Sequence, residues 1–154
     1  MKVTLLCVGR LGAAPEASLA LDWAARATLS GRAHGLGPVD ILEVEARKPG
    51  KAAEAEVLLE KLDGGHLIAC DEHGQARGSR EFSAMIGRLR DDGVRRLVFV
   101  IGGADGLEEK GLAAARSRLA FGPQTWPHAL VRAMLAEQVY RAVTLLAGSP
   151  YHRD

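Results

Sequence analysis

The sequence has few of the residues that would indicate a secreted or membrane-spanning protein. Only two of its 154 residues are cysteines, Cys7 and Cys70, and both lie in apolar runs without forming a CxxC pair. This favours buried, unreactive thiols in a reducing cytosol. The apolar run at residues 3–8 is too short for a signal peptide or a membrane span. We therefore expect a cytoplasmic protein with no membrane segment.

The sequence also lacks an excess of charge of one sign. Twenty lysines and arginines stand against nineteen aspartates and glutamates, which leaves a formal net charge of +1. Any affinity for nucleic acid would therefore have to come from local patches. Aromatic residues make up only 5% of the chain, so base stacking would rest on a few rings. No HExxH, GxSxG or Walker motif is present, which leaves metallohydrolase and serine-type chemistry without support, and no metal is expected.

The chain does contain alternating strand and helix patterns. Five apolar runs are typical of strands, at residues 3–8, 39–44, 66–70, 96–101 and 118–122. Helical patterns occur at residues 14–29, 52–62 and 79–90, in a short segment after Gly106, and at about 129–146. Such alternation predicts an α/β fold with a mostly parallel sheet and helices on both faces. The length fits a single domain over residues 1–154.

A glycine-rich turn follows the strand predicted at 96–101. In Ile101-Gly102-Gly103-Ala104-Asp105-Gly106, glycines would let backbone N–H groups approach a ligand at the carboxyl end of the strand. A tight turn without a ligand would have the same pattern. Because the turn is not GxGxxG and no acidic residue for a ribose follows, a dinucleotide site is disfavoured.

The last predicted helix and the residues after it combine several chemical groups. Glu137, Tyr140 and Arg141 share one helical face, either as part of a site or as a weak surface ion pair. The terminal Pro150-Tyr151-His152-Arg153-Asp154 offers groups that can stack a base and hold a phosphate, although chain ends are often frayed. An apolar helix this long near the end of a small domain also suggests a subunit interface.

One loop is basic. Lys48 and Lys51, in Arg47-Lys48-Pro49-Gly50-Lys51, would either be solvated or contact phosphate. His128, at the start of the last predicted helix, is expected to cap or pack.

Several segments occur together in an order and spacing that are typical of one family. They are Cys70-Asp71-Glu72-His73-Gly74, Ser79-Arg80-Glu81-Phe82, residues 99–107, Thr125-Trp126-Pro127-His128, Glu137-Gln138-Val139-Tyr140-Arg141-Ala142 and Pro150-Tyr151-His152-Arg153. In these segments the chain resembles the SPOUT-class RNA methyltransferases that methylate N3 of a pseudouridine in 23S ribosomal RNA. The resemblance covers the whole chain and is strongest from residue 66 onward.

The resemblance implies a fold, a cofactor and partners. The C-terminal part of the sheet would be threaded into a trefoil knot, a rare exception to the rule that chains do not thread loops. The protein would be a homodimer that binds S-adenosyl-L-methionine in the knot. It would methylate helix 69 of 23S rRNA in the assembled ribosome.

The resemblance also implies site residues. The cofactor would contact Cys70, Gly102, Gly103, Gly122, Pro123, Gln124, Thr125, Trp126 and Pro127. The catalytic group would comprise Glu137, Tyr140, Tyr151, His152 and Arg153, and RNA would contact Arg141, Arg153, Lys48 and Lys51. Either Glu137 or His152 could accept the proton that leaves N3. Cys70, Gly122-Pro123 and Trp126 depart from the residues usual in the family.

Two alternatives stay open. A knotted methyltransferase could act on tRNA or on another rRNA position. A non-catalytic, flavodoxin-like nucleotide-binding module would explain the alternating pattern and the glycine turn, but it would leave Glu137-Gln138-Val139-Tyr140-Arg141-Ala142 and the C-terminal tail without a role.

Overall fold

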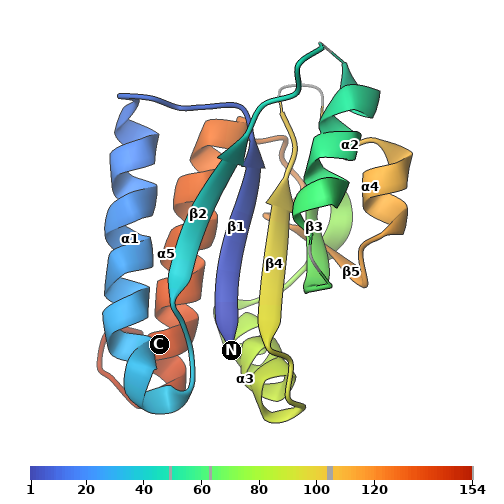
Figure 1. The fold of residues 1–154 in the computed structure, drawn as a ribbon. Coiled ribbons are helices and arrows are strands. Elements are labelled where there is room, and N and C mark those ends of the chain that lie inside the picture. The colour runs from blue at the N-terminus through green and yellow to red at the C-terminus, as the bar shows by residue number, and fades with distance from the viewer. Residues whose placement is uncertain (49, 63, 104–105, 154) are drawn as a thin grey trace.

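The computed structural model describes residues 1–48, 50–62, 64–103 and 106–153. Its core is a five-stranded sheet with the order β2-β1-β4-β3-β5, in which every pairing between neighbouring strands is parallel (Figure 1). The strands are β1 (Lys2–Val8), β2 (Val39–Val44), β3 (His66–Ala76), β4 (Arg96–Ile101) and β5 (Ser117–Ala120). The helices are α1 (Pro15–Gly31), a 3-10 turn (Arg32–His34), α2 (Lys51–Lys61), α3 (Ser79–Asp91), α4 (Glu109–Ala113) and α5 (His128–Leu146).

Successive residues of the central strands pack alternately into two separate hydrophobic cores, one on each face of the sheet. In β4, Leu97 and Phe99 pack on one side of the sheet, whereas Val98 and Val100 pack on the other. Successive side chains of a strand point to opposite faces of the sheet. Because residues facing either side are apolar and buried, both faces of the sheet are covered. The α/β prediction with helices on both faces is therefore confirmed.

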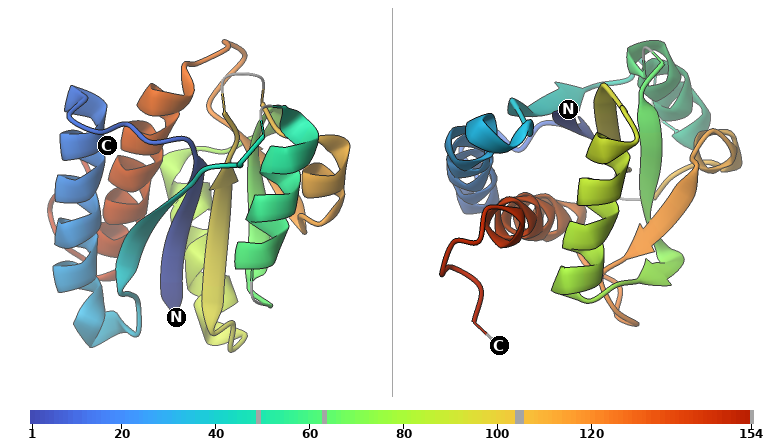
Figure 2. Two further views of the ribbon diagram at one scale, coloured as in Figure 1. Left: turned by 45° about the horizontal axis from the view of Figure 1, so that its top comes forward. Right: turned by 90° about the horizontal axis from the view of Figure 1, so that it is seen from below.

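The two faces carry different helices. Helices α1, α3 and α5 lie together on one side, and α2 and the short α4 lie on the other (Figure 2). The larger core therefore lies beneath α1, α3 and α5. Among the described residues, no helix is both long and apolar enough to cross a membrane.

The strand order separates this fold from a flavodoxin-like one. Flavodoxin-like sheets have the order 2-1-3-4-5, whereas here β4 lies between β1 and β3. The flavodoxin-like alternative is therefore wrong at the level of the fold. The sequence could not exclude it, because an alternating pattern of strands and helices does not determine strand order.

One strand is longer than predicted. The apolar run predicted a strand that ends at Cys70, but β3 continues to Ala76 after an irregularity between Cys70 and Gln75. Gly74 lies so close to β5 that a Cβ atom there would be 2.7 Å from backbone atoms of Leu119. The extension depends on this pairing with a distant strand, so its polar sequence gave no local signal.

Candidate functional site

A cavity of about 760 Å³ lies beyond the end of β4. It is lined by Lys51, Cys70, Asp71, Glu72, His73, Ile101, Gly102, Gly103, Gly106, Leu107, Leu112, Leu119, Ala120, Phe121, Gln124, Thr125, Trp126, Pro127, His128 and Val131. Seven of the nine predicted cofactor residues are among them: Cys70, Gly102, Gly103, Gln124, Thr125, Trp126 and Pro127. Of the other two, Gly122 lines a neighbouring cavity, and Pro123 lines neither of the two.

The glycine turn forms one wall of this cavity and is folded tightly on itself. The Gly106 N–H donates to the Gly103 carbonyl at 3.0 Å, and a Cβ atom on Gly102 would be 2.6 Å from the Gly106 backbone. Glycine at position 102 is therefore required by the turn itself. Ala104 and Asp105 of the same motif lie outside the described residues.

The opposite wall is the segment that leads from β5 into α5. The Thr125 hydroxyl donates to Glu72 on β3 at 2.8 Å, and the Trp126 indole N–H donates to the Phe121 carbonyl at 3.1 Å. These two bonds fix a segment that lies outside any helix or strand. Gln124, Thr125 and Trp126 thus bring an amide, a hydroxyl and an indole to the lining of the same cavity.

Cys7 is buried, as predicted, whereas Cys70 is only partly buried and lines the first cavity. Burial raises the pKa of Cys7 to about 12, and burial also raises the pKa of Cys70 far above its usual range. Both side chains therefore stay neutral thiols at physiological pH. A neutral thiol at Cys70 is compatible with an electrophilic ligand in the cavity that it lines.

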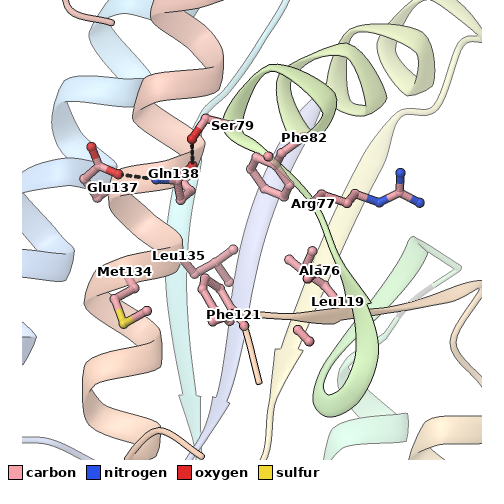
Figure 3. Close-up of a pocket in the computed structure, with 13 residues that line it drawn as sticks. Ala76, Arg77, Ser79, Phe82, Leu119, Phe121, Met134, Leu135, Glu137 and Gln138 are labelled. Atoms are coloured by element: carbon pink, nitrogen blue, oxygen red, sulfur yellow. Dashed lines mark hydrogen bonds between the residues drawn. The ribbon is translucent and has the colours of Figure 1, made fainter. Parts of the chain in front are cut away.

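A second cavity, of about 630 Å³, adjoins the first and shares Leu119, Ala120 and Phe121 with it. It lies between the start of α3, the end of β5 and α5 (Figure 3). A polar chain spans one side, where Ser79 donates to Gln138 and Gln138 donates to Glu137, each at 2.8 Å (Figure 3).

Glu137 connects this second cavity to the C-terminal tail. Its Oε1 atom accepts hydrogen bonds from the Tyr151 hydroxyl at 3.0 Å and from Arg141 at 2.5 Å. The Arg141 guanidinium also lies 4.9 Å from the centre of the Tyr151 ring and 3.2 Å from Nδ1 of His152. The tail is thus ordered against its own helix α5, and the frayed-end interpretation does not hold for these residues.

Burial and hydrogen bonds to Glu137 determine the protonation of Tyr151 and Arg141. Burial and then the hydrogen bond to Glu137 raise the pKa of Tyr151, and the hydrogen bond to Glu137 raises the pKa of Arg141. The phenol therefore stays protonated and the guanidinium stays charged at neutral pH.

Trp23 on α1 completes the cluster and was not predicted from the sequence. Its ring centre lies 5.3 Å from that of Tyr140 and 5.9 Å from that of Tyr151, and the Arg26 guanidinium lies over the Trp23 ring, 4.9 Å from its centre. The rings of Tyr140 and Tyr151 meet edge to face at 4.7 Å. We refer to Trp23, Glu137, Tyr140, Arg141, Tyr151 and His152 as the tail cluster. Only long-range packing of α1 on α5 brings Trp23 there.

The remaining predicted residues lie apart from one another. Lys51 lines the first cavity, whereas Lys48 and Arg153 are exposed elsewhere. Pro49 and Asp154 lie outside the described residues. In the part of the chain that the structure describes, no three His, Cys, Asp or Glu residues are grouped to hold a metal ion.

Comparison with known proteins gives a consistent result. The profile of a family described as "Predicted SPOUT methyltransferase" matches residues 1–152. The chain is 71% identical over its full length to the full length of "Ribosomal RNA large subunit methyltransferase H" from Caulobacter sp. (strain K31). It is 70% identical to the protein of the same name from Caulobacter vibrioides, covering 100% of this chain and 99% of that protein.

A solved structure supports the fold alone. The probable methyltransferase from Bordetella pertussis superimposes with a TM-score of 0.53 at 18% identity, covering 92% of this chain and 96% of that one. Because the family model matches residues 1–152 and the relatives are 70–71% identical over the whole chain, the chain belongs to the SPOUT methyltransferase family.

Proposed function

We propose that this protein transfers a methyl group from S-adenosyl-L-methionine to N3 of a pseudouridine in helix 69 of 23S rRNA. The observation that carries the proposal is the identity of 71% with a named large-subunit rRNA methyltransferase. The match covers 100% of this chain and 100% of that protein. The pseudouridine and helix 69 come from the family resemblance in the segments quoted above. The reaction takes place in the cytoplasm on the assembled ribosome.

The first cavity fits the cofactor. Its volume of about 760 Å³ falls within the usual range for small-molecule sites, about 300–1,000 Å³. Its walls offer a glycine backbone, a hydroxyl, an amide and an indole, which suit an adenosine with its ribose. When bound, S-adenosyl-L-methionine supplies an electrophilic methyl group on a positively charged sulfur. The residues from Gln124 to Pro127 and the Gly102–Gly103 turn would hold and align it.

The tail cluster would orient the target base. Tyr151 offers a ring held by Tyr140, Trp23 and Arg141, and such stacking tolerates any base. Glu137 accepts hydrogen bonds from Tyr151, Arg141 and Gln138, so we assign it the role of holding the tail in shape. Because a guanidinium only donates, Nδ1 of His152 is the accepting nitrogen beside Arg141. The proton that leaves N3 would pass to this cluster or to solvent.

We further propose that the working enzyme is a knotted homodimer. Within one subunit no residue of the tail cluster lines the first cavity. The outer face of α1 also exposes Leu19, Leu21 and Leu29, which a second subunit could cover. In such a dimer the tail cluster of one subunit would complete the cofactor cavity of the other. The whole chain would act as one domain, with residues 66–154 forming the knot.

Methylation of purified substrates tests the proposal. The protein and labelled cofactor would be incubated with assembled ribosomes, free 23S rRNA or tRNA. We expect label in 23S rRNA from ribosomes and little in free rRNA, because a subunit with a net charge of +1 has little attraction for RNA alone. Preferential labelling of tRNA, or of another rRNA position, would support the alternative knotted methyltransferase and contradict the proposed target.

A further inference from the structure

Glu54 lies behind the glycine wall of the first cavity. A Cβ atom on Gly103 would come within 3.1 and 3.2 Å of the two carboxylate oxygens of Glu54, so the carboxylate is directly against the turn. Gly103 itself lines the cavity. Glu54 belongs to the first turn of α2, whose buried residues Ala55 and Leu58 fix the helix against the sheet.

Within the described part of the chain, the structure gives the Glu54 side chain no hydrogen bond or ion pair. The carboxylates of described residues that line the cavity are engaged, since Asp71 accepts from the backbone of His73 and Glu72 accepts from Thr125. Glu54 is partly buried, so solvent screens its charge less than that of a fully exposed residue. Its negative potential therefore extends through the Gly103 backbone into the cavity.

Among the described residues, no ion pair neutralises the Glu54 carboxylate. Lys51, one turn earlier on α2, lines the cavity, but no ion pair joins it to Glu54. His73 and His128 lie on other segments of the wall, and the structure pairs His73 with Glu72. Because Gly103 has no side chain, only backbone separates the Glu54 carboxylate from the cavity.

We propose that Glu54 makes the cavity select the positively charged methyl donor over its neutral product. This inference rests on the proposed function, because it takes the ligand to be S-adenosyl-L-methionine. The donor and S-adenosyl-L-homocysteine have the same shape apart from one methyl group, and they differ by the unit charge on sulfur. A carboxylate near the turn stabilises the donor and loses that attraction once the methyl group has left. Glu54 thereby favours exchange of product for fresh donor.

Calorimetric dissociation constants for the donor and the product test this directly. For Glu54→Gln we expect donor binding to weaken roughly tenfold, or about 1.4 kcal/mol, because the attraction between the carboxylate and the positively charged sulfur is lost. Product binding should change by less than about twofold. Glu54→Asp should keep most of the preference because it keeps the charge.

Glu56→Gln is the matched control, since Glu56 lies exposed on the same helix and should change neither constant. Glu54→Ala is a second charge-removing variant, and thermal unfolding shows whether each variant is folded. Equal weakening for donor and product, or no change for either, would overturn the inference. Failure of the unmodified protein to bind either molecule would instead overturn the proposed function, and this inference with it.

Discussion

Gly103 matters because of the side chain that it lacks. A Cβ atom there would lie 3.1 Å from the Glu54 carboxylate and 3.3 Å from Val8, so a branched side chain would have to displace these neighbours and disturb the cavity wall that Gly103 forms. We expect Gly103→Val to abolish binding of S-adenosyl-L-methionine while the protein stays folded, because the larger side chain distorts the cavity wall. Isothermal titration with and without a chelator measures the loss, and chelation should not affect the unmodified protein.

Gly111→Ala provides the control for that substitution. Gly111 lies within α4, and a Cβ atom there meets nothing within 4 Å. Alanine should leave the affinity unchanged at this position. Normal binding by Gly103→Val would show that the cofactor cavity has been assigned to the wrong part of the molecule.

The Cys7 thiol should make the free energy of unfolding depend on pH in the alkaline range. Burial raises its pKa in the folded protein to about 12, above its usual value of 9.0. The folded state thus favours the protonated thiol, so its contribution is fully present below pH 9 and is lost as the pH rises toward 12. The loss should be about 1.4 kcal/mol per pH unit in this window.

Denaturant unfolding of the unmodified protein and of Cys7→Ala at several pH values between 8 and 11 tests this. Lysines and tyrosines titrate in both proteins, so the difference between the two slopes isolates Cys7. We expect a shallower decline for Cys7→Ala. Parallel declines would show that the Cys7 thiol is not protected by burial.

At the scale of helices and strands, α5 is held to the sheet by a buried arginine. Arg132 is 1% exposed and donates to Glu43 at 2.8 Å, to the Gly9 carbonyl at 3.0 Å and to the Val8 carbonyl. It thus joins α5 to the ends of β1 and β2. Replacing it would remove the charged partner of Glu43, which would keep only the Leu11 N–H as a donor, and the bonds from Arg132 to two backbone carbonyl groups.

We expect Arg132→Met to lower the free energy of unfolding by about 3–5 kcal/mol, the usual effect of removing one partner of a buried ion pair. Arg88→Met, on the exposed side of α3, should change it by less than about 0.5 kcal/mol. Urea unfolding compares the two variants. Similar small losses for both would mean that Arg132 is not a structural link.

The same elements show what the sequence could and could not predict. Strands such as β4 were identified correctly because their side chains are apolar on both faces of the sheet, which gives a continuous apolar run in the sequence. The glycine turn and Gln124–Pro127 were predicted by family resemblance, and the structure places them around one cavity. The burial of Arg132 and the place of Trp23 were missed. Both depend on which elements pack together, and neither residue carries a local signal of that packing.

The predicted first helix also illustrates this limit. Its pattern gave the start and end of α1 to within two residues, because proline, alanine and glycine act locally. Its neighbour α5 follows it more than ninety residues later, and periodicity cannot reveal that contact. The tail cluster therefore could be assembled only in part from the sequence.

At the scale of the whole molecule, subunit mixing tests whether two chains share a site. Deleting residues 151–154 should spare folding and cofactor affinity but nearly abolish methylation, because the tail cluster lies outside the first cavity. The Gly103→Val subunit keeps its tail but lacks the cofactor. Heterodimers of the two should regain activity, since one site would combine an intact cavity with an intact tail.

Heterodimers must be shown to form, for example by native mass spectrometry of two differently tagged subunits. An inactive mixture that contains them would mean that each subunit uses its own tail. Full activity of the deletion variant alone would leave the tail without a catalytic role.

The most direct measurement is mass spectrometry of 23S rRNA from cells with and without this gene. We expect the fragment containing helix 69 to carry one additional methyl group on a pseudouridine only when the gene is present. Restoring the gene should restore that group, and a Gly103→Val copy should not. An unchanged helix 69 fragment, with a methyl group lost instead from tRNA or from another rRNA position, would contradict the proposed target.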